Sequence, residues 1–233
     1  MFGKRLYQHR ALVSGFALAI LLFGSGASPA AAEKVRADLR EQRQGTVAVA
    51  SSDQCTPTGD KGLRCRSFTV DIFDGAELSS ERAPFRGTRV CVSLLTYTVV
   101  EGEPQAEGNQ EERGCATLPA GTLQVARDLA SVTLPATAIT LEQVRCTPVG
   151  EHEAVCEVIG SRKATISGTW TATSPLISSH DRNQYRNGTC VETSEYREQR
   201  RDTTAELTLD GEAQPVQYSS VANVSSRITR QCR

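Results

Sequence analysis

The chain has 233 residues, a formal net charge of −1, eight cysteines and an aromatic content of only 5%. Its first 32 residues carry three basic and no acidic side chains, so the rest of the chain has a formal net charge of −4. This mild acidity offers no whole-molecule attraction to nucleic acid or to anionic lipid. We therefore expect neither a nucleic-acid partner nor a membrane partner for the mature protein.

Residues 1–32 have the pattern of a cleaved secretory signal peptide. Three basic residues among the first ten precede an uncharged apolar run over 11–23, and the alanines at 30–32 fit a small-residue cleavage site. The apolar run is too short for a membrane-spanning helix, which needs about 20 residues. We expect a secreted or periplasmic protein, with an uncleaved N-terminal anchor as the alternative.

The segment that follows is expected to be a polar N-terminal leader over residues 33–45. Residues 33–44 look helical, but they lack the apolar stripe that would hold a helix against a core. We therefore expect a loose segment ahead of the folded part of the chain.

The eight cysteines form the most informative set of residues. All of them follow the signal peptide, and an even number of cysteines in an exported chain predicts a disulfide framework. None of them forms a close C-x-x-C pair of the kind that metal sites use, so we expect no metal and no cofactor. The cysteines are Cys55, Cys65, Cys91, Cys115, Cys146, Cys156, Cys190 and Cys232.

An internal repeat suggests two domains. The segment from Cys55 to Cys65 and the segment from Cys146 to Cys156 both read C-T-P-x-G-x5-C, at an offset of 91 residues. Tandem duplication of a domain explains such a match.

Domain boundaries follow from this repeat. We expect a first domain over 46–136 and a second over 137–233. The sequence Leu134-Pro-Ala-Thr137 would then be the linker between them.

The repeat also predicts how the cysteines pair. Proline and glycine just inside the first cysteine of each segment favour a turn and oppose a helix. Each segment is therefore expected to be a β-hairpin whose two cysteines face each other within disulfide reach. This predicts the pairs Cys55–Cys65 and Cys146–Cys156, and the order of the remaining cysteines favours Cys91–Cys115 and Cys190–Cys232.

Apolar and polar residues alternate in several segments, which is the pattern of half-buried antiparallel strands. In residues 163–173 one face carries Ala164, Ile166 and Trp170, and the other face carries threonine and serine. Similar alternation occurs around Val70 and around Leu207, which is followed by an Asp-Gly turn. The predicted fold is all-β, with two tandem disulfide-bonded antiparallel β-sandwich domains of immunoglobulin-like character.

Two charged segments are candidate binding sites. Residues 101–113 carry five glutamates and one arginine, and we expect an acidic hairpin tip that could also serve as a recognition loop. Residues 181–202 contain five arginines that suggest an anion-binding patch, but five acidic residues in the same segment balance them. That count favours a solvated strand and loop over an anion site.

Catalytic groups are scarce. His152 and His180 are the histidines that follow the signal peptide, and His180 precedes an aspartate that lies on the other side of an extended chain. We expect a secreted, non-catalytic binding or surface-structural protein with an extracellular protein or glycan as partner, and no catalytic residue. The alternatives are a protease inhibitor that presents a stapled hairpin and a hydrolase that acts through two carboxylates.

Overall fold

The structure is a computed structural model that describes residues 38–58, 62–100, 103–148 and 154–232. The expected signal peptide lies outside these residues. The chain from Val35 to its C-terminus forms one compact unit.

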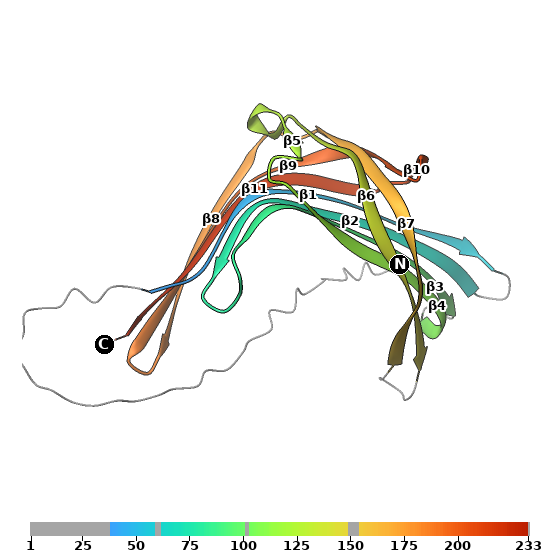
Figure 1. Cartoon of the computed structure of the whole chain (residues 1–233), viewed down its shortest axis with the longest axis horizontal. Coiled ribbons are helices and arrows are strands. Elements are labelled where there is room, and N and C mark those ends of the chain that lie inside the picture. The colour runs from blue at the N-terminus through green and yellow to red at the C-terminus, as the bar shows by residue number, and fades with distance from the viewer. Residues whose placement is uncertain (1–37, 59–61, 101–102, 149–153, 233) are drawn as a thin grey trace, which may run out of the picture. The chain divides into compact units, whose positions relative to one another are not determined.

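The described residues form one antiparallel sheet of eleven strands, which confirms the all-β prediction (Figure 1). Its elements are β1 (Asp38–Pro57), β2 (Gly62–Ser79), β3 (Phe85–Val100), β4 (Glu103–Leu118), β5 (Gln124–Val125), the 3-10 turn η1 (Arg127–Leu129), β6 (Ser131–Pro148), β7 (Ala154–Ala172), β8 (Ile177–Asn187), β9 (Cys190–Leu209), β10 (Glu212–Gln214) and β11 (Tyr218–Cys232).

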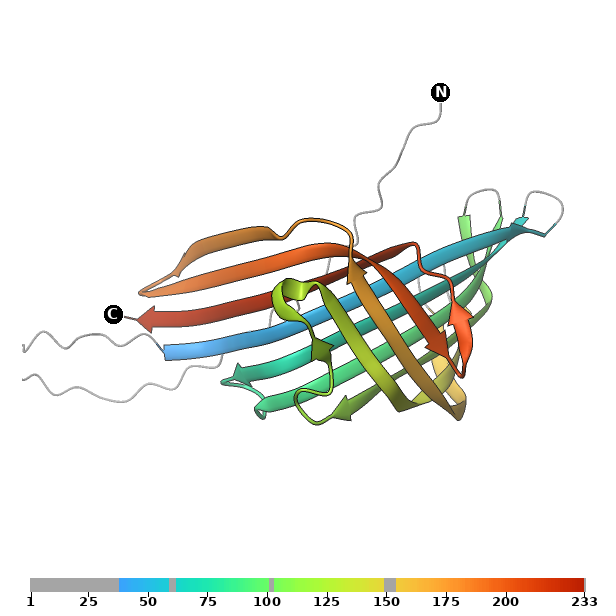
Figure 2. The ribbon, with the colours of Figure 1, turned by 90° about the horizontal axis from the view of Figure 1, so that it is seen from above.

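Eight of these strands close into a ring. The order β1-β2-β3-β4-β6-β7-β9-β11 returns to β1, so each of the eight is hydrogen bonded to two neighbours. Figure 2 shows β6 and β7 crossing in front of the blue and green strands of the first half of the chain. Because these eight strands close on themselves, the strands that pair on one side only are β8 and the short strands β5 and β10.

The structure has one sheet in place of the two expected immunoglobulin-like sandwiches. Strands from the two expected halves pair directly, β1 with β11 and β4 with β6. The expected linker lies inside β6, where Leu134 and Thr137 are buried on either side of a register shift. The sequence pattern of a disulfide-bonded hairpin specifies how its own two strands pair, but not how it pairs with other hairpins. The same pattern therefore fits one sheet or two.

Two other expectations for local structure are wrong. Residues 38–45 belong to β1 rather than to a loose or helical leader, because they pair with β11 on one side and with β2 on the other. The segment expected to be an acidic hairpin tip does lie between two antiparallel strands, but from Glu103 onward it belongs to β4 and pairs with β3 rather than forming a loop. In both segments backbone pairing in the sheet outweighs a polar composition that suits a loop.

The core fills the interior of the ring. Alternate residues of the strands point inward, as the period-two pattern predicts for Val70, Ile166 and Leu207, all of which are buried. Trp170 is completely buried, and its indole N–H donates a hydrogen bond of 2.9 Å to the carbonyl of Val49 on β1. A tryptophan from the second half of the chain therefore ties β7 to the first strand.

Three disulfides join register partners on neighbouring strands. They are Cys55–Cys65 in the β1–β2 hairpin, Cys91–Cys115 between β3 and β4, and Cys190–Cys232 between β9 and β11. These are three of the four pairings that the sequence predicts. In the fourth, Cys146 and Cys156 are register partners and Cys156 is disulfide-bonded, but the side chain of Cys146 lies outside the described residues.

A row of three glycines marks the edge of the ring. Gly45, Gly75 and Gly87 are register partners on β1, β2 and β3. A Cβ atom on Gly45 would collide with the backbone of β2, and one on Gly75 would collide with the backbone of β1. Only glycine therefore permits the close approach of these two strands at this row.

Beyond this row the sheet continues past the core. We call the part formed by β8 with residues 38–44 of β1, 190–200 of β9 and 223–232 of β11 the arm, and residues 76–79 of β2 continue beside β1. The strand order in the arm is β8-β9-β11-β1, and β8 is exposed along its whole length (Figure 1). Both faces of the arm are exposed or half-buried, so its side chains can contact other molecules.

Candidate functional site on the arm

The register of the arm determines which charged residues share a face. His180 on β8 pairs with Arg197 on β9, and Arg182 pairs with Glu195. Glu195 in turn pairs with Arg227 on β11. Because directly paired residues of antiparallel strands point to the same side, even-numbered residues of β8 share a face with odd-numbered residues of β9 and β11.

We call this side the basic face. It carries the exposed residues Arg182, Arg186, Arg197 and Arg227 and a single acidic residue, Glu195. The uncharged residues around them are Ser178, Gln184, Thr193, Gln199, Asn223, Ser225, Thr229 and Gln231. The face therefore combines a local excess of positive charge with many hydrogen-bonding groups.

Two shallow grooves run along the basic face. The first has a volume of about 640 Å³ and lies at the tip of the arm, where Arg182, Arg186 and Arg227 line it. The second has a volume of about 710 Å³ and lies nearer to the ring, where Arg197 and Asn223 line it together with the acidic residues Asp74 and Glu198, so the excess of positive charge is confined to the first groove. An extended ligand could therefore contact residues along much of the arm.

The opposite face has a different composition. It carries Asp181, Glu192 and Glu198 together with Tyr185 and Tyr196. Partial burial is the main factor that raises the pKa of the Tyr196 hydroxyl, and the nearby Glu198 carboxylate contributes to the rise. Arginines on this face, which include Arg200 and Arg230, alternate with these acids, so it has no excess of positive charge.

Residues 181–202 form exposed strands, as expected, but their charges are not evenly mixed. The five arginines and five acids of that segment do balance, but they divide between two faces. Arg201 is not available as a ligand-binding group, because its guanidinium donates hydrogen bonds to the carbonyls of Asp128 and Ser174. Arg200 lies on the opposite face, so three arginines of the segment remain on the basic face, where Glu195 is the acidic residue of the segment beside them. Arg227 from β11 is a fourth arginine on this face.

The other sequence candidates do not form a site. His180 lies on the basic face and Asp181 on the opposite face, so they do not make a base and its orienting acid. His152 lies outside the described residues. Within the part of the chain that the structure describes, no three His, Cys, Asp or Glu side chains are arranged to hold a metal ion. No helix among the described residues is long and apolar enough to cross a membrane.

An ion network lies in the ring rather than on the arm. The guanidinium of Arg162 on β7 donates to the Glu112 carboxylate on β4 at 2.8 Å and to the Asp210 carboxylate at 2.6 Å. The hydrogen bond from Arg162 is the main factor that lowers the pKa of Glu112, and a hydrogen bond from the Thr165 backbone N–H is the main factor that lowers the pKa of Asp210. The network links β4, β7 and the turn that follows β9, and its groups bond to one another, so we assign it a structural role.

Comparisons with known proteins provide no family. No protein-family model matches the chain, and no curated protein matches it. A solved structure that resembles it is the enduracididine biosynthesis enzyme MppR, complexed with the condensation product of pyruvate and imidazole 4-carboxaldehyde. The match has 11% sequence identity and a TM-score of 0.24, and it covers 89% of this chain and 96% of that chain.

The comparisons do not bear out the function that we expected from the sequence. We expected a secreted, non-catalytic binding or surface-structural protein, with an inhibitor or a hydrolase as alternatives, and the solved structure that they report is that of a biosynthetic enzyme. At this TM-score the likeness itself carries no function over to this chain.

Proposed function

We propose that the basic face of the arm binds a linear acidic polysaccharide. The observation that carries this proposal is the grouping of Arg182, Arg186, Arg197 and Arg227 on one exposed face with Glu195 as the single acidic residue. Guanidinium groups bind carboxylates and sulfate-like oxyanions through paired hydrogen bonds, which makes arginine suited to such ligands.

The positions of the arginines favour an extended ligand. Arg182 and Arg186 are four residues apart on β8, which corresponds to about 13 Å along a strand. Arg182 and Arg227 are two strands apart in one row, which corresponds to about 10 Å. A polymer with repeated anionic groups can contact several of these arginines at once, and each additional contact increases the overall affinity.

The basic face favours a polysaccharide over a single-stranded nucleic acid. Proteins that bind single strands combine positive charge with aromatic side chains on which the bases stack. The two tyrosines of the arm, Tyr185 and Tyr196, lie on the opposite face. The hydroxyl and amide groups of the basic face suit the hydroxyl-rich surface of a sugar chain.

A binding measurement with defined polymers tests the proposal. We expect the purified protein to bind heparin, with an affinity that falls steeply between 50 and 300 mM NaCl because exposed charges are screened by salt. Dextran, which is neutral, serves as the control and should not bind. Binding of single-stranded DNA with equal or higher affinity would favour a nucleic acid instead, and absence of heparin binding at 50 mM NaCl would overturn the proposal.

We also propose that the protein acts outside the cytosol after cleavage following residue 32. The three disulfides support this proposal, because disulfides form and persist mainly in oxidising compartments. N-terminal sequencing of the protein from its native host should give a first residue at position 33. A product that retains Met1 in the cytosolic fraction would contradict export.

A further inference from the structure

The immediate surroundings of Glu195 distinguish it from the other acidic residues of the arm. In its row, Arg182 lies on one side on β8 and Arg227 on the other side on β11. Arg197 lies two residues further along β9, on the same face. Three arginines therefore surround one carboxylate at distances that their long side chains can span.

The contact between Glu195 and Arg182 is loose. The Arg182 Nε atom and the Glu195 Oε1 atom are 3.6 Å apart, and the Arg182 side chain is 59% exposed. An exposed ion pair of this kind contributes little to stability, since its charges remain solvated. An incoming anion can therefore replace Glu195 as the partner of Arg182 without a large energetic cost.

We infer that Glu195 is an internal competitor for the ligand and determines which acidic polymers the basic face accepts. This inference rests on the proposed function. Glu195 lies between Arg182 and Arg227 in its row, so a ligand oxyanion that contacts both arginines must come close to the Glu195 side chain. A ligand must displace it, or must tolerate its negative charge nearby.

This competition disfavours polymers whose anionic groups are sparse carboxylates. A ligand carboxylate brings the same charge and hydrogen-bonding pattern as the Glu195 carboxylate, which is already held next to the arginines by the backbone. The ligand also loses conformational freedom when it binds, whereas Glu195 is part of the folded chain and loses no further conformational freedom. A densely sulfated polymer brings several charges, so that Arg186 and Arg197 contribute while Glu195 is displaced. The basic face is therefore selective for dense sulfation.

The substitution Glu195→Gln tests this inference, with Glu192→Gln as the matched control. Glu192 is three residues before Glu195 on the same strand, lies on the opposite face and lines neither groove, and its substitution makes the same change in net charge. Affinities for heparin, which is densely sulfated, and for polygalacturonate, which carries only carboxylates, are measured for the wild type and both variants at one salt concentration. Circular dichroism confirms that each variant is folded.

We expect Glu195→Gln to increase the affinity for polygalacturonate about two- to fivefold more than the affinity for heparin, so that the preference for heparin over polygalacturonate becomes smaller. Glu192→Gln should change neither affinity by more than about twofold, because Glu192 does not face the ligand and its exposed charge is screened by salt. An equal increase for both polymers, or no increase for either, would overturn the role of Glu195. If the wild type binds and depends on Arg182 while Glu195→Gln has no effect, only this inference fails. If neither the wild type nor Glu195→Gln binds either polymer, the proposed function and this inference both fail.

Discussion

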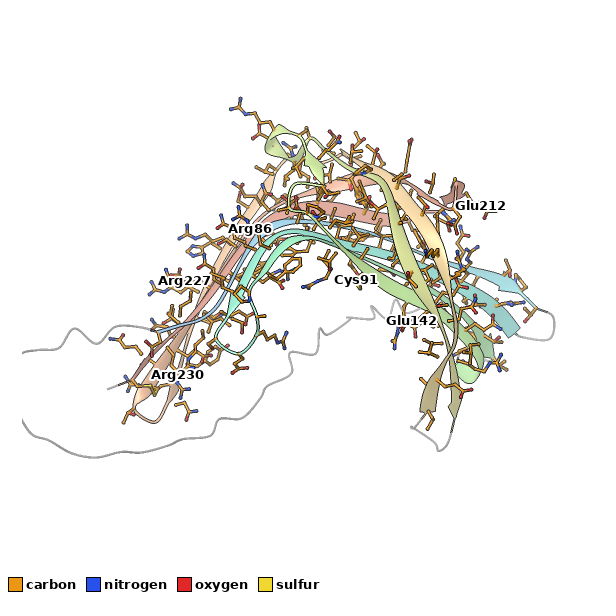
Figure 3. All side chains as sticks on the ribbon, in the orientation of Figure 1. Arg86, Cys91, Glu142, Glu212, Arg227 and Arg230 are labelled. Carbon is orange, nitrogen blue, oxygen red and sulfur yellow. A yellow bond between two sulfur atoms is a disulfide. The ribbon has the colours of Figure 1, made fainter. Side chains whose placement is uncertain are left out.

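Arg227 and Arg230 lie three residues apart on β11 and point to opposite faces of the arm. Arg227 pairs with Glu195 on the basic face, whereas Arg230 pairs with Glu192 on the other face. Figure 3 shows both arginines on the arm, away from the ring. Both residues are arginines on the same strand, so substituting either one changes the net charge equally. A comparison of the two variants therefore shows whether ligand affinity depends on the face of the arm or on the net charge.

This pair provides the first prediction. We expect Arg227→Gln to weaken heparin binding by about two- to fivefold, the range of one exposed ionic contact. Arg230→Gln should leave the affinity unchanged, because the residue does not face the ligand. Isothermal titration calorimetry at low salt measures both. Equal losses in the two variants would show that net charge, rather than the basic face, governs binding.

The second prediction concerns the ion network of the ring. Replacing Arg162 with glutamine removes its hydrogen bonds to Glu112 and Asp210 and leaves the half-buried Glu112 carboxylate with fewer partners. We expect the free energy of unfolding to fall by about 1–3 kcal/mol. Chemical denaturation measures this. The substitution Arg182→Gln, which removes an exposed arginine from the arm, should change the stability by less than about 1 kcal/mol.

The same network predicts a dependence of stability on pH. The folded protein lowers the pKa of both Glu112 and Asp210. Each carboxylate therefore stabilises the fold above its unfolded pKa, near pH 4, and this contribution is lost as the pH falls through the lower folded pKa. We expect acid to destabilise the wild type below about pH 4 more than it destabilises Glu112→Gln. Thermal unfolding between pH 7 and pH 2.5 checks this, and parallel curves would contradict it.

The glycine row at the edge of the ring gives a further prediction. The Cβ atom of alanine at position 75 would lie 2.6 Å from the Gly45 Cα atom, and a backbone contact cannot give way as a flexible side chain can. We expect Gly75→Ala to cost about 3 kcal/mol or more, as overpacked substitutions do. Gly160→Ala is the control, because its Cβ would meet the end of the Gln143 side chain, which can move. Similar stabilities of the two variants would contradict the account of the row.

The last prediction concerns the disulfide at the tip of the arm. The Cys190–Cys232 bridge joins residues 42 positions apart, whereas the Cys55–Cys65 bridge joins residues 10 positions apart. We expect loss of Cys190–Cys232 to raise amide exchange in β8 and in the ends of β9 and β11, with little change in the ring. Replacing both cysteines with serine and measuring hydrogen exchange by mass spectrometry tests this. Uniform acceleration over the whole sheet would show that the arm does not open separately.

Much of the local structure could be read from the chain. Alternation around Val70, Ile166 and Leu207 identifies strands and their buried faces, because side chains of a strand point alternately to its two sides. The spacing of Cys55 and Cys65 around a Pro-x-Gly sequence predicts a hairpin with its cysteines opposite each other, and these two residues are register partners. These features depend on residues close together in the sequence. The duplication that the repeat suggests stays a prediction.

The closure of the ring and the basic face depended on the tertiary structure. No local pattern shows that β1 pairs with β11 or that Trp170 bonds to Val49, because these partners are more than 100 residues apart. The charges of residues 181–202 sum to zero in the sequence, and only the β8–β9 register shows that Arg182 and Arg197 share a face. The alternation within each strand could be seen in the sequence. Which face of one strand shares a side with which face of its neighbour depends on the register between the two strands, and the sequence did not show that register.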